Sequence, residues 1–147
     1  MLSARGHLDG LKVVVAGPKG NIARSWLEAA RLLPISVTQW CPVGQGFEVK
    51  DLPSNGAVTQ DVAALEEADV IVTDCWPKSE AQEAAGYTVT GAMLDRCRPD
   101  VMFIPCPPVT RGEEVDAAAM GHPSCGATEA RAYLMHVQNA VMVEALG

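Results

Sequence analysis

The chain has 147 residues, of which 48% are hydrophobic and 20% are charged, and its formal net charge is −7. This composition predicts one folded domain with a hydrophobic core and excludes a disordered chain. The negative charge and the lack of a basic stripe argue against nucleic acid or an anionic membrane as partners, and no apolar run reaches the roughly 20 residues that span a bilayer. Residues 1–10 lack the apolar centre of a secretory signal, so we expect a cytoplasmic protein.

Cysteine and histidine are distributed in a way that disfavours a metal site. The cysteines are odd in number, are widely spaced and form no CxxC pair, and the three histidines are not grouped with them. This pattern predicts neither zinc ligation nor a disulfide framework, so we expect no metal. Most of the five are expected to be buried apolar thiols; they are Cys41, Cys75, Cys97, Cys106 and Cys125.

The first predicted unit is a strand, a turn and a helix. Residues 11–16 form a β-branched run, which predicts a strand that stops at the Gly-Pro-Lys-Gly turn of residues 17–20. Asn21 then occupies the position of a helix N-cap, where its side chain accepts bonds from free backbone N–H groups. The helix is predicted over residues 22–33 and ends at Pro34. Its inward face is expected to carry Ile22, Trp26, Ala29, Ala30 and Leu33.

Strands and helices continue to alternate along the rest of the chain. Further strands are predicted over residues 35–40, 69–73, 101–104 and 124–128, and a loop rich in Gly and Pro over residues 41–56. Short helices are predicted over residues 60–68, 79–85, 90–97 and 112–120. A long helix is predicted over residues 129–146, with inward positions at Tyr133, His136, Val137, Ala140, Val141 and Val143.

This alternation predicts an α/β fold: a doubly wound parallel sheet of about five strands with helices on both faces, a Rossmann-like three-layer arrangement. Continuous apolar runs fit strands that are covered on both sides. No repeat or linker divides the chain, so residues 1–147 are expected to form a single domain. Ligands of such sheets bind at the carboxyl ends of the strands, and three predicted strand ends carry polar chemistry: residues 17–21, 73–78 and 106–114.

Two of these strand ends offer groups for a small charged ligand. The turn at residues 17–21 has neither the spacing of GxGxxG nor the ending of a Walker loop, so we expect no nucleotide cofactor. The helix start behind it favours an anion such as a carboxylate, although a simple turn capped by Asn21 accounts for it equally well. Asp74 directly follows an apolar strand, where its carboxylate would either hold a substrate ammonium or cap the next turn.

The most informative segment is residues 105–115. Three prolines surround Cys106 and predict a rigid turn, with a cis peptide bond at Pro107 or Pro108. A thiol held so firmly at a strand end is better placed for chemistry than the other four. No histidine or lysine is adjacent in sequence to activate it.

Five segments occur in a fixed order: Asn21 after a Gly-rich turn, residues 73–76 (TDCW), Cys106 with Pro108, residues 111–115 (RGEEV), and residues 136–138 (HVQ). This order resembles the second domain of ornithine and aspartate carbamoyltransferases, and the ornithine enzymes most closely. That family has a Gly-rich turn ending in Asn, then T-D-x-W, then an H-C-L-P turn with R-G-x-E-V, then a terminal helix with H-x-Q. The resemblance covers essentially the whole chain.

The resemblance implies roles for residues at matching positions. Asn21 and Asp74 would hold the α-amino-acid end of the acceptor, Cys106 would lie beside its amine, and the turn at Pro107 would meet both substrates. Asp74 and Cys106 are thereby implied as catalytic residues that assist attack of a neutral amine on the carbonyl of carbamoyl phosphate. Further substrate contacts are implied for Trp76, Lys78, Arg111 and Arg131.

Several segments depart from the family pattern. Pro105 and Pro107 replace the His and Leu that flank the family's Cys, and residues 78–80 (KSE) replace S-M-G. The terminal E-N-R-L-H is also altered: its Arg, which contacts carbamoyl phosphate, aligns near Leu134, and Arg131 is the candidate substitute. The first domain, with its phosphate-binding S-T-R-T loop, has no counterpart in the chain. The acceptor is therefore expected to be an amino acid or an unusual amine.

Two functions remain open. In the favoured one, a second polypeptide supplies the carbamoyl-phosphate domain, and the two chains form a split carbamoyltransferase through an apolar patch at Trp40, Trp76 and residues 107–108. In the other, the chain is a binding or accessory module that holds an amino-acid-like ligand without transfer. Met1 and Gly147 are expected to bound a complete gene product rather than an excised domain. The uncovered surface is expected to make the protein a homo- or hetero-oligomer.

Overall fold

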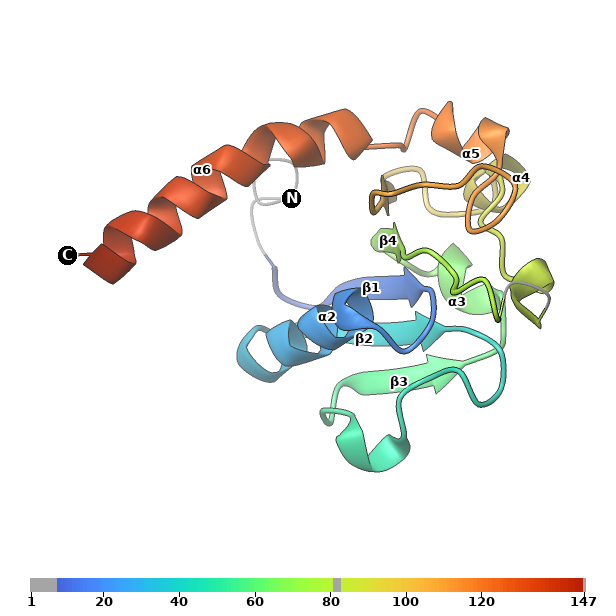
Figure 1. Ribbon diagram of the computed structural model, residues 1–147, viewed down its shortest axis with the longest axis horizontal. Coiled ribbons are helices and arrows are strands. Elements are labelled where there is room, and N and C mark those ends of the chain that lie inside the picture. Colours follow the sequence, from blue (N-terminus) through green and yellow to red (C-terminus); the bar gives the residue numbers. More distant parts are fainter. Residues whose placement is uncertain (1–7, 81–82, 147) are drawn as a thin grey trace.

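The computed structural model describes residues 8–80 and 83–146, which contain one five-stranded sheet (Figure 1). All five strands are parallel, in the order β3-β2-β1-β4-β5. The strands are β1 (Leu11–Ala16), β2 (Ile35–Trp40), β3 (Gly56–Thr59), β4 (Val70–Thr73) and β5 (Met102–Pro105). The helices are α2 (Asn21–Leu32), α3 (Ala63–Glu66), α4 (Gly91–Leu94), α5 (Ala117–Met120) and α6 (Ala127–Leu146), with 3₁₀ turns η1 (Val49–Asp51) and η2 (Glu83–Gly86).

Helices cover both faces of the sheet. α2 packs on one face, where its buried side chains Ala23, Leu27 and Ala30 meet apolar residues of β1, β2 and β4. α3, α4 and α5 cover the other face, which holds a second apolar cluster around Ile71 and Phe103. β1 and β4 are apolar at nearly all positions because both sides of these central strands are buried. The predicted three-layer α/β fold is therefore confirmed.

The order of the strands reverses between β1 and β4. The chain moves from β1 outward to β2 and β3, returns to β4 on the other side of β1, and then continues to β5. The connections that leave β1 and β4 therefore diverge, and sheets of this kind bind ligands at such a point, beyond the carboxyl ends of the strands. The residues that follow these two strands are Gly17 and Asp74.

One strand was missed and one predicted strand does not form. β3 pairs with β2, but no strand was predicted there, because its sequence GAVT is only partly buried and directly follows the loop rich in Gly and Pro. The strand predicted over residues 124–128 does not form. The backbone of Phe103 exchanges hydrogen bonds with Ser124 and Gly126, both 2.8 Å, and the chain then enters α6 at Ala127.

The helices differ from their predicted ends and faces. The N-cap of α2 is Gly20 and not Asn21, which is the first helical residue, and no side chain caps this helix. Leu33, predicted to face inward, is 41% exposed. The short helices are single turns, and the 79–85 prediction corresponds only to η2 in its described part, since residues 81–82 lie outside the described residues. The other predicted inward positions of α2 pack on the core, Ala30 fully and Ile22, Trp26 and Ala29 in part.

None of the described side chains of helix α6 is buried. Its first residues lie near β5, and the helix then runs along the outside of the molecule, away from the edge where the strands end (Figure 1). The predicted inward positions are therefore wrong, because all six side chains are exposed. The exposed large apolar residues of α6 are Tyr133, Leu134, Met135, Val137, Val141, Met142, Val143 and Leu146.

The apolar patch predicted at the strand ends is not there. Trp40 and Trp76 are only 2% and 5% exposed, because both rings pack in the core beside Tyr87. Pro107 and Pro108 are exposed, and the peptide bond between them is cis, as predicted. No helix within the described residues is long and apolar enough to cross a membrane.

Candidate functional site

Three of the predicted site residues follow neighbouring strands. Asn21 begins α2 after the turn that follows β1, Asp74 directly follows β4 and Cys106 directly follows β5. Their backbones extend the sheet: the Asp74 N–H donates to Ala16 O at 3.1 Å, and the Cys106 N–H donates to Thr73 O at 3.3 Å. The sheet thus brings these residues to the edge where its strand order reverses, as the sequence predicted for a ligand site.

Asp74 lies in close contact with the glycine-rich turn. A Cβ atom placed on Gly17 would lie 2.9 Å from the Asp74 Cβ and 3.2 Å from its backbone nitrogen. A Cβ on Gly20 would lie 3.0 Å from the Asp74 Oδ2. Glycine at both positions therefore lets the carboxylate sit against the start of α2.

The Asp74 carboxylate is held from one side. Its Oδ1 accepts a hydrogen bond of 2.9 Å from the backbone N–H of Cys75. Its Oδ2 lies toward the turn at Gly20, and the side chain remains partly exposed. A fixed, partly exposed carboxylate can accept charge-assisted hydrogen bonds from an ammonium group. Asn21, exposed at the first position of α2, adds an amide within the same turn.

Cys106 presents a protonated thiol beside this carboxylate. Burial raises the pKa of the Cys106 thiol above its ordinary value, and the neighbouring Asp74 and Cys75 raise it further. Burial and Asp74 act on the pKa of Cys75 in the same direction. A raised pKa keeps a thiol neutral near pH 7, so Cys106 offers a weak hydrogen-bonding group rather than a thiolate nucleophile.

The cysteines are less deeply buried than predicted. All five are free; Cys41 alone is fully buried, and burial raises its pKa to about 11. The other four are partly exposed. Within the described residues no group of three or more His, Cys, Asp or Glu side chains could hold a metal ion.

Glu114 is a residue of the site region that the sequence did not single out. Its side chain is 1% exposed, and its Oε1 accepts a hydrogen bond of 2.5 Å from the Thr110 backbone N–H, which fixes the turn after Cys106. Its Oε2 has no hydrogen-bond partner among the described residues. Glu114 also raises the pKa of Cys75, so its charge reaches the strand ends. The sequence signal that could have identified Glu114 was its position in the RGEEV segment of residues 111–115.

The other predicted contacts surround the strand ends less closely. Trp76 is buried against Tyr87, and it lines a cavity of about 130 Å³ together with Gly112. Lys78, Pro107 and Arg111 are exposed. Arg131 is exposed on α6 and does not follow a strand. The roles of these residues in substrate binding remain predictions.

Comparison with known proteins finds relatives of the whole domain. A family model described as the aspartate/ornithine carbamoyltransferase Asp/Orn binding domain matches residues 9–145. The ornithine carbamoyltransferase of Cupriavidus pinatubonensis is 32% identical over 154 residues, which cover 96% of this chain and 50% of that protein. The Syntrophus aciditrophicus enzyme of the same name is 30% identical over 97% of this chain and 52% of its own length.

Solved structures of ornithine carbamoyltransferases also superpose on this chain. The ornithine carbamoyltransferase of Thermus thermophilus superposes with a TM-score of 0.91 and 28% identity over 99% of this chain and 52% of that one. The Pyrococcus furiosus enzyme superposes with a TM-score of 0.84 and 29% identity over 96% of this chain and 51% of that one. The chain thus spans about half the length of the curated relatives it matches.

Proposed function

The chain belongs to the aspartate/ornithine carbamoyltransferase family through its Asp/Orn binding domain, and from this premise we propose that it is the amino-acid-binding half of a split carbamoyltransferase. A separate polypeptide would bind carbamoyl phosphate and complete the active site. The observation that carries the proposal is the placement of the Asp74 carboxylate and the Cys106 thiol directly after the adjacent strands β4 and β5, beside the point between β1 and β4 where the strand order reverses.

The proposed reaction assigns a limited task to each of these residues. The acceptor amine attacks the carbonyl carbon of carbamoyl phosphate, a C–N bond forms, the bond from that carbon to the phosphate oxygen breaks, and phosphate leaves with the electron pair. The amine loses one proton in the process, and the departing phosphate can accept it. Asp74 would hold the amino-acid ammonium by charge-assisted hydrogen bonds, and the neutral Cys106 thiol would orient the attacking amine. Asn21 would bind the acceptor carboxylate through its amide N–H groups.

Helix α6 supports the proposal of a protein partner. A helix that is apolar on every side is ordinarily buried, whereas α6 exposes its large apolar side chains to solvent. The relatives are about twice as long as this chain. In them, the additional half of the chain is available to cover a surface that is exposed here. We propose that the carbamoyl-phosphate-binding polypeptide covers α6.

The remaining aspects of the proposal concern the organisation of the protein. We propose that the chain forms one domain, that the carbamoyl-phosphate domain is a separate polypeptide and that the working form is an oligomer. The cytoplasm is the proposed location.

A second candidate function is an amino-acid-binding module without transfer activity. The observation that favours it is the position of Arg131, the candidate phosphate contact, which is exposed on α6 rather than at the strand ends. In this case Asp74 and Asn21 would still hold an amino acid. Transfer activity would then be absent with any partner.

Product formation separates the two candidates. The chain would be incubated with carbamoyl phosphate and a panel of amino acids and amines, alone and with a candidate carbamoyl-phosphate-binding polypeptide. We expect carbamoylated product only in the mixture, with strong loss in Asp74→Ala and Cys106→Ala and retained activity in Cys125→Ala as the matched control. An inactive mixture in which ligand binding is intact would contradict the split enzyme and support the binding module.

A further inference from the structure

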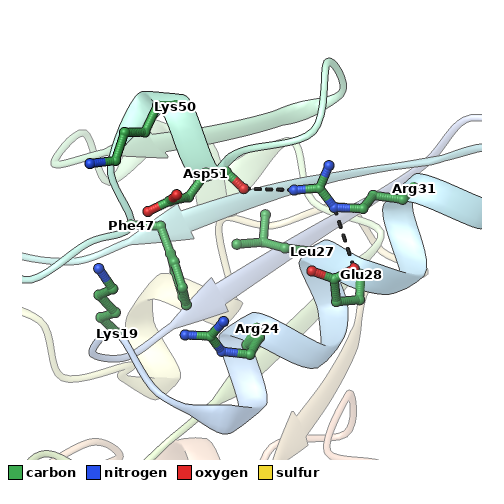
Figure 2. A pocket seen from close by; sticks show the side chains of 8 residues that line it. All are labelled: Lys19, Arg24, Leu27, Glu28, Arg31, Phe47, Lys50 and Asp51. Atoms are coloured by element: carbon green, nitrogen blue, oxygen red, sulfur yellow. Dashed lines mark hydrogen bonds and ion pairs between the residues drawn. The ribbon is translucent and has the colours of Figure 1, made fainter.

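A pocket that contains neither Asp74 nor Cys106 has an unusual concentration of positive charge. It has a volume of about 420 Å³ and lies between α2, the turn after β1 and the segment from Phe47 to η1 (Figure 2). Four cationic side chains line it, Lys19, Arg24, Arg31 and Lys50, against two carboxylates. We call it the basic pocket. Its excess of positive charge stands out in a chain whose net charge is −7.

Two of the four cations are uncompensated. Arg31 pairs with Glu28 at 3.4 Å, and Lys50 pairs with Glu48 at 2.7 Å. Lys19 and Arg24 form no ion pair with any carboxylate within residues 8–80 and 83–146, and instead lie 5.2 Å and 5.3 Å from the centroid of the Phe47 ring. Figure 2 shows Lys19 to the left of this ring and Arg24 below it.

The walls of the pocket are fixed by hydrogen bonds that need no ligand. Gln39 is fully buried, donates from Nε2 to Gly17 O at 3.0 Å, and accepts the Phe47 backbone N–H at 3.0 Å. The Lys19 N–H donates to Gln45 O at 2.8 Å, which ties the turn after β1 to the following loop. A site whose walls are fixed before binding loses little entropy on taking up a ligand.

The second wall is joined to α2 in the same way. Arg31 donates from Nη2 to the Asp51 backbone carbonyl at 2.8 Å, which connects the helix to η1 across the pocket (Figure 2). The carboxylates of Glu28 and Asp51 line the pocket beside these groups. They repel a second anionic group but accept hydrogen bonds from hydroxyl groups.

We propose that the basic pocket binds a small phosphate ester that carries hydroxyl groups. The phosphate would lie between Lys19 and Arg24, because a guanidinium donates two parallel hydrogen bonds to phosphate oxygens and an ammonium adds a point charge. The hydroxyl groups of the ester would face Glu28 and Asp51. The volume of the pocket falls within the range of small-molecule sites. This binding is separate from carbamoyl transfer and does not involve Asp74.

Calorimetric titration of the full chain with ribose 5-phosphate, inorganic phosphate and ribose tests the proposal. We expect saturable binding of the ester, weaker binding of inorganic phosphate and none of ribose. Lys19→Gln and Arg24→Gln should each weaken ester binding about tenfold or more, because each removes a charge-assisted contact. Asp74→Ala should leave ester binding unchanged, which separates this site from the acceptor site.

Matched controls distinguish a built site from general attraction to charge. Lys12 and Arg96 pair with Glu67 and Glu66, away from the pocket, so Lys12→Gln and Arg96→Gln remove the same charge elsewhere. Both controls should retain ester binding. Absence of saturable binding, or an equal loss in the controls, would overturn the proposal. Equal affinity for inorganic phosphate and for the ester would overturn the assignment of an ester.

Discussion

Replacing Gly17 by alanine places a methyl group directly against the candidate site. The added Cβ would lie 2.9 Å from the Asp74 Cβ, 3.2 Å from its N and 3.4 Å from its Cα. Carbon atoms in contact are normally about 3.5–4.0 Å apart, so the first contact is too short by roughly 0.6–1.1 Å. The opposing atoms belong to the backbone and the first side-chain carbon of Asp74, which cannot rotate away.

The strain of such an insertion is about 1–3 kcal/mol, and the reduced freedom of the unfolded alanine chain offsets about 0.4–1 kcal/mol of it. We therefore expect Gly17→Ala to lower the free energy of unfolding by about 1–2 kcal/mol in urea titration. Displacement of Asp74 by even part of an ångström should also weaken acceptor binding. Gly86→Ala is the control, because its Cβ would meet nothing within 4 Å. A Gly17→Ala protein with wild-type stability and binding would refute the close approach of Asp74 to this turn.

Three further predictions follow from particular contacts. Gln39→Leu leaves the Gly17 carbonyl and the Phe47 N–H without their hydrogen-bond partner. The variant should therefore lower the free energy of unfolding by about 2–4 kcal/mol. A loss below about 0.5 kcal/mol would show that Gln39 does not hold the turn after β1 to the loop at Phe47. The raised pKa of Cys106 leaves a smaller fraction of thiolate at a given pH. Its alkylation, measured by mass spectrometry, should therefore be slower at pH 8 than the alkylation of glutathione and should become faster above pH 9. Alkylation of Cys106 faster than that of glutathione at pH 8 would contradict the raised pKa. Val141 on α6 is 62% exposed, so Val141→Glu should change the free energy of unfolding of the free chain by less than about 0.5 kcal/mol. The variant should nevertheless abolish carbamoylation in the mixture with the partner polypeptide. Gln138→Glu on the same helix should preserve carbamoylation in the mixture.

The sequence predicts the centre of this fold well and its edges poorly. β1 and β4 are buried on both sides and show apolar runs, and β2 shows an apolar/polar alternation, so all three can be identified. β3 has four residues, and its strand character comes from pairing with β2 rather than from its composition. The strand predicted at residues 124–128 makes only one bridge, at Cys125, because the chain turns into α6 two residues later.

The candidate site was predictable where it depends on topology. Residues that follow parallel strands meet at one edge of the sheet, so Asp74 and Cys106 were identified together, and the family resemblance is confirmed by the comparisons. The buried state of Trp76 depends on its packing against Tyr87, which no spacing encodes. The basic pocket was missed because Lys19 and Arg24 are brought to Phe47 by a loop whose path is set by buried Gln39.

The most direct test of the central claim, that Asp74 holds the ammonium of an amino-acid acceptor, is calorimetric titration of ornithine into the wild-type chain and into Asp74→Asn. Loss of one charge-assisted contact costs about 1.5–3 kcal/mol, so the variant should bind ornithine about 10 to 100 times more weakly. Asp61→Asn, which changes the same charge at an exposed helix start, should bind like wild type. Equal affinity of the wild-type and Asp74→Asn proteins for ornithine would contradict the account.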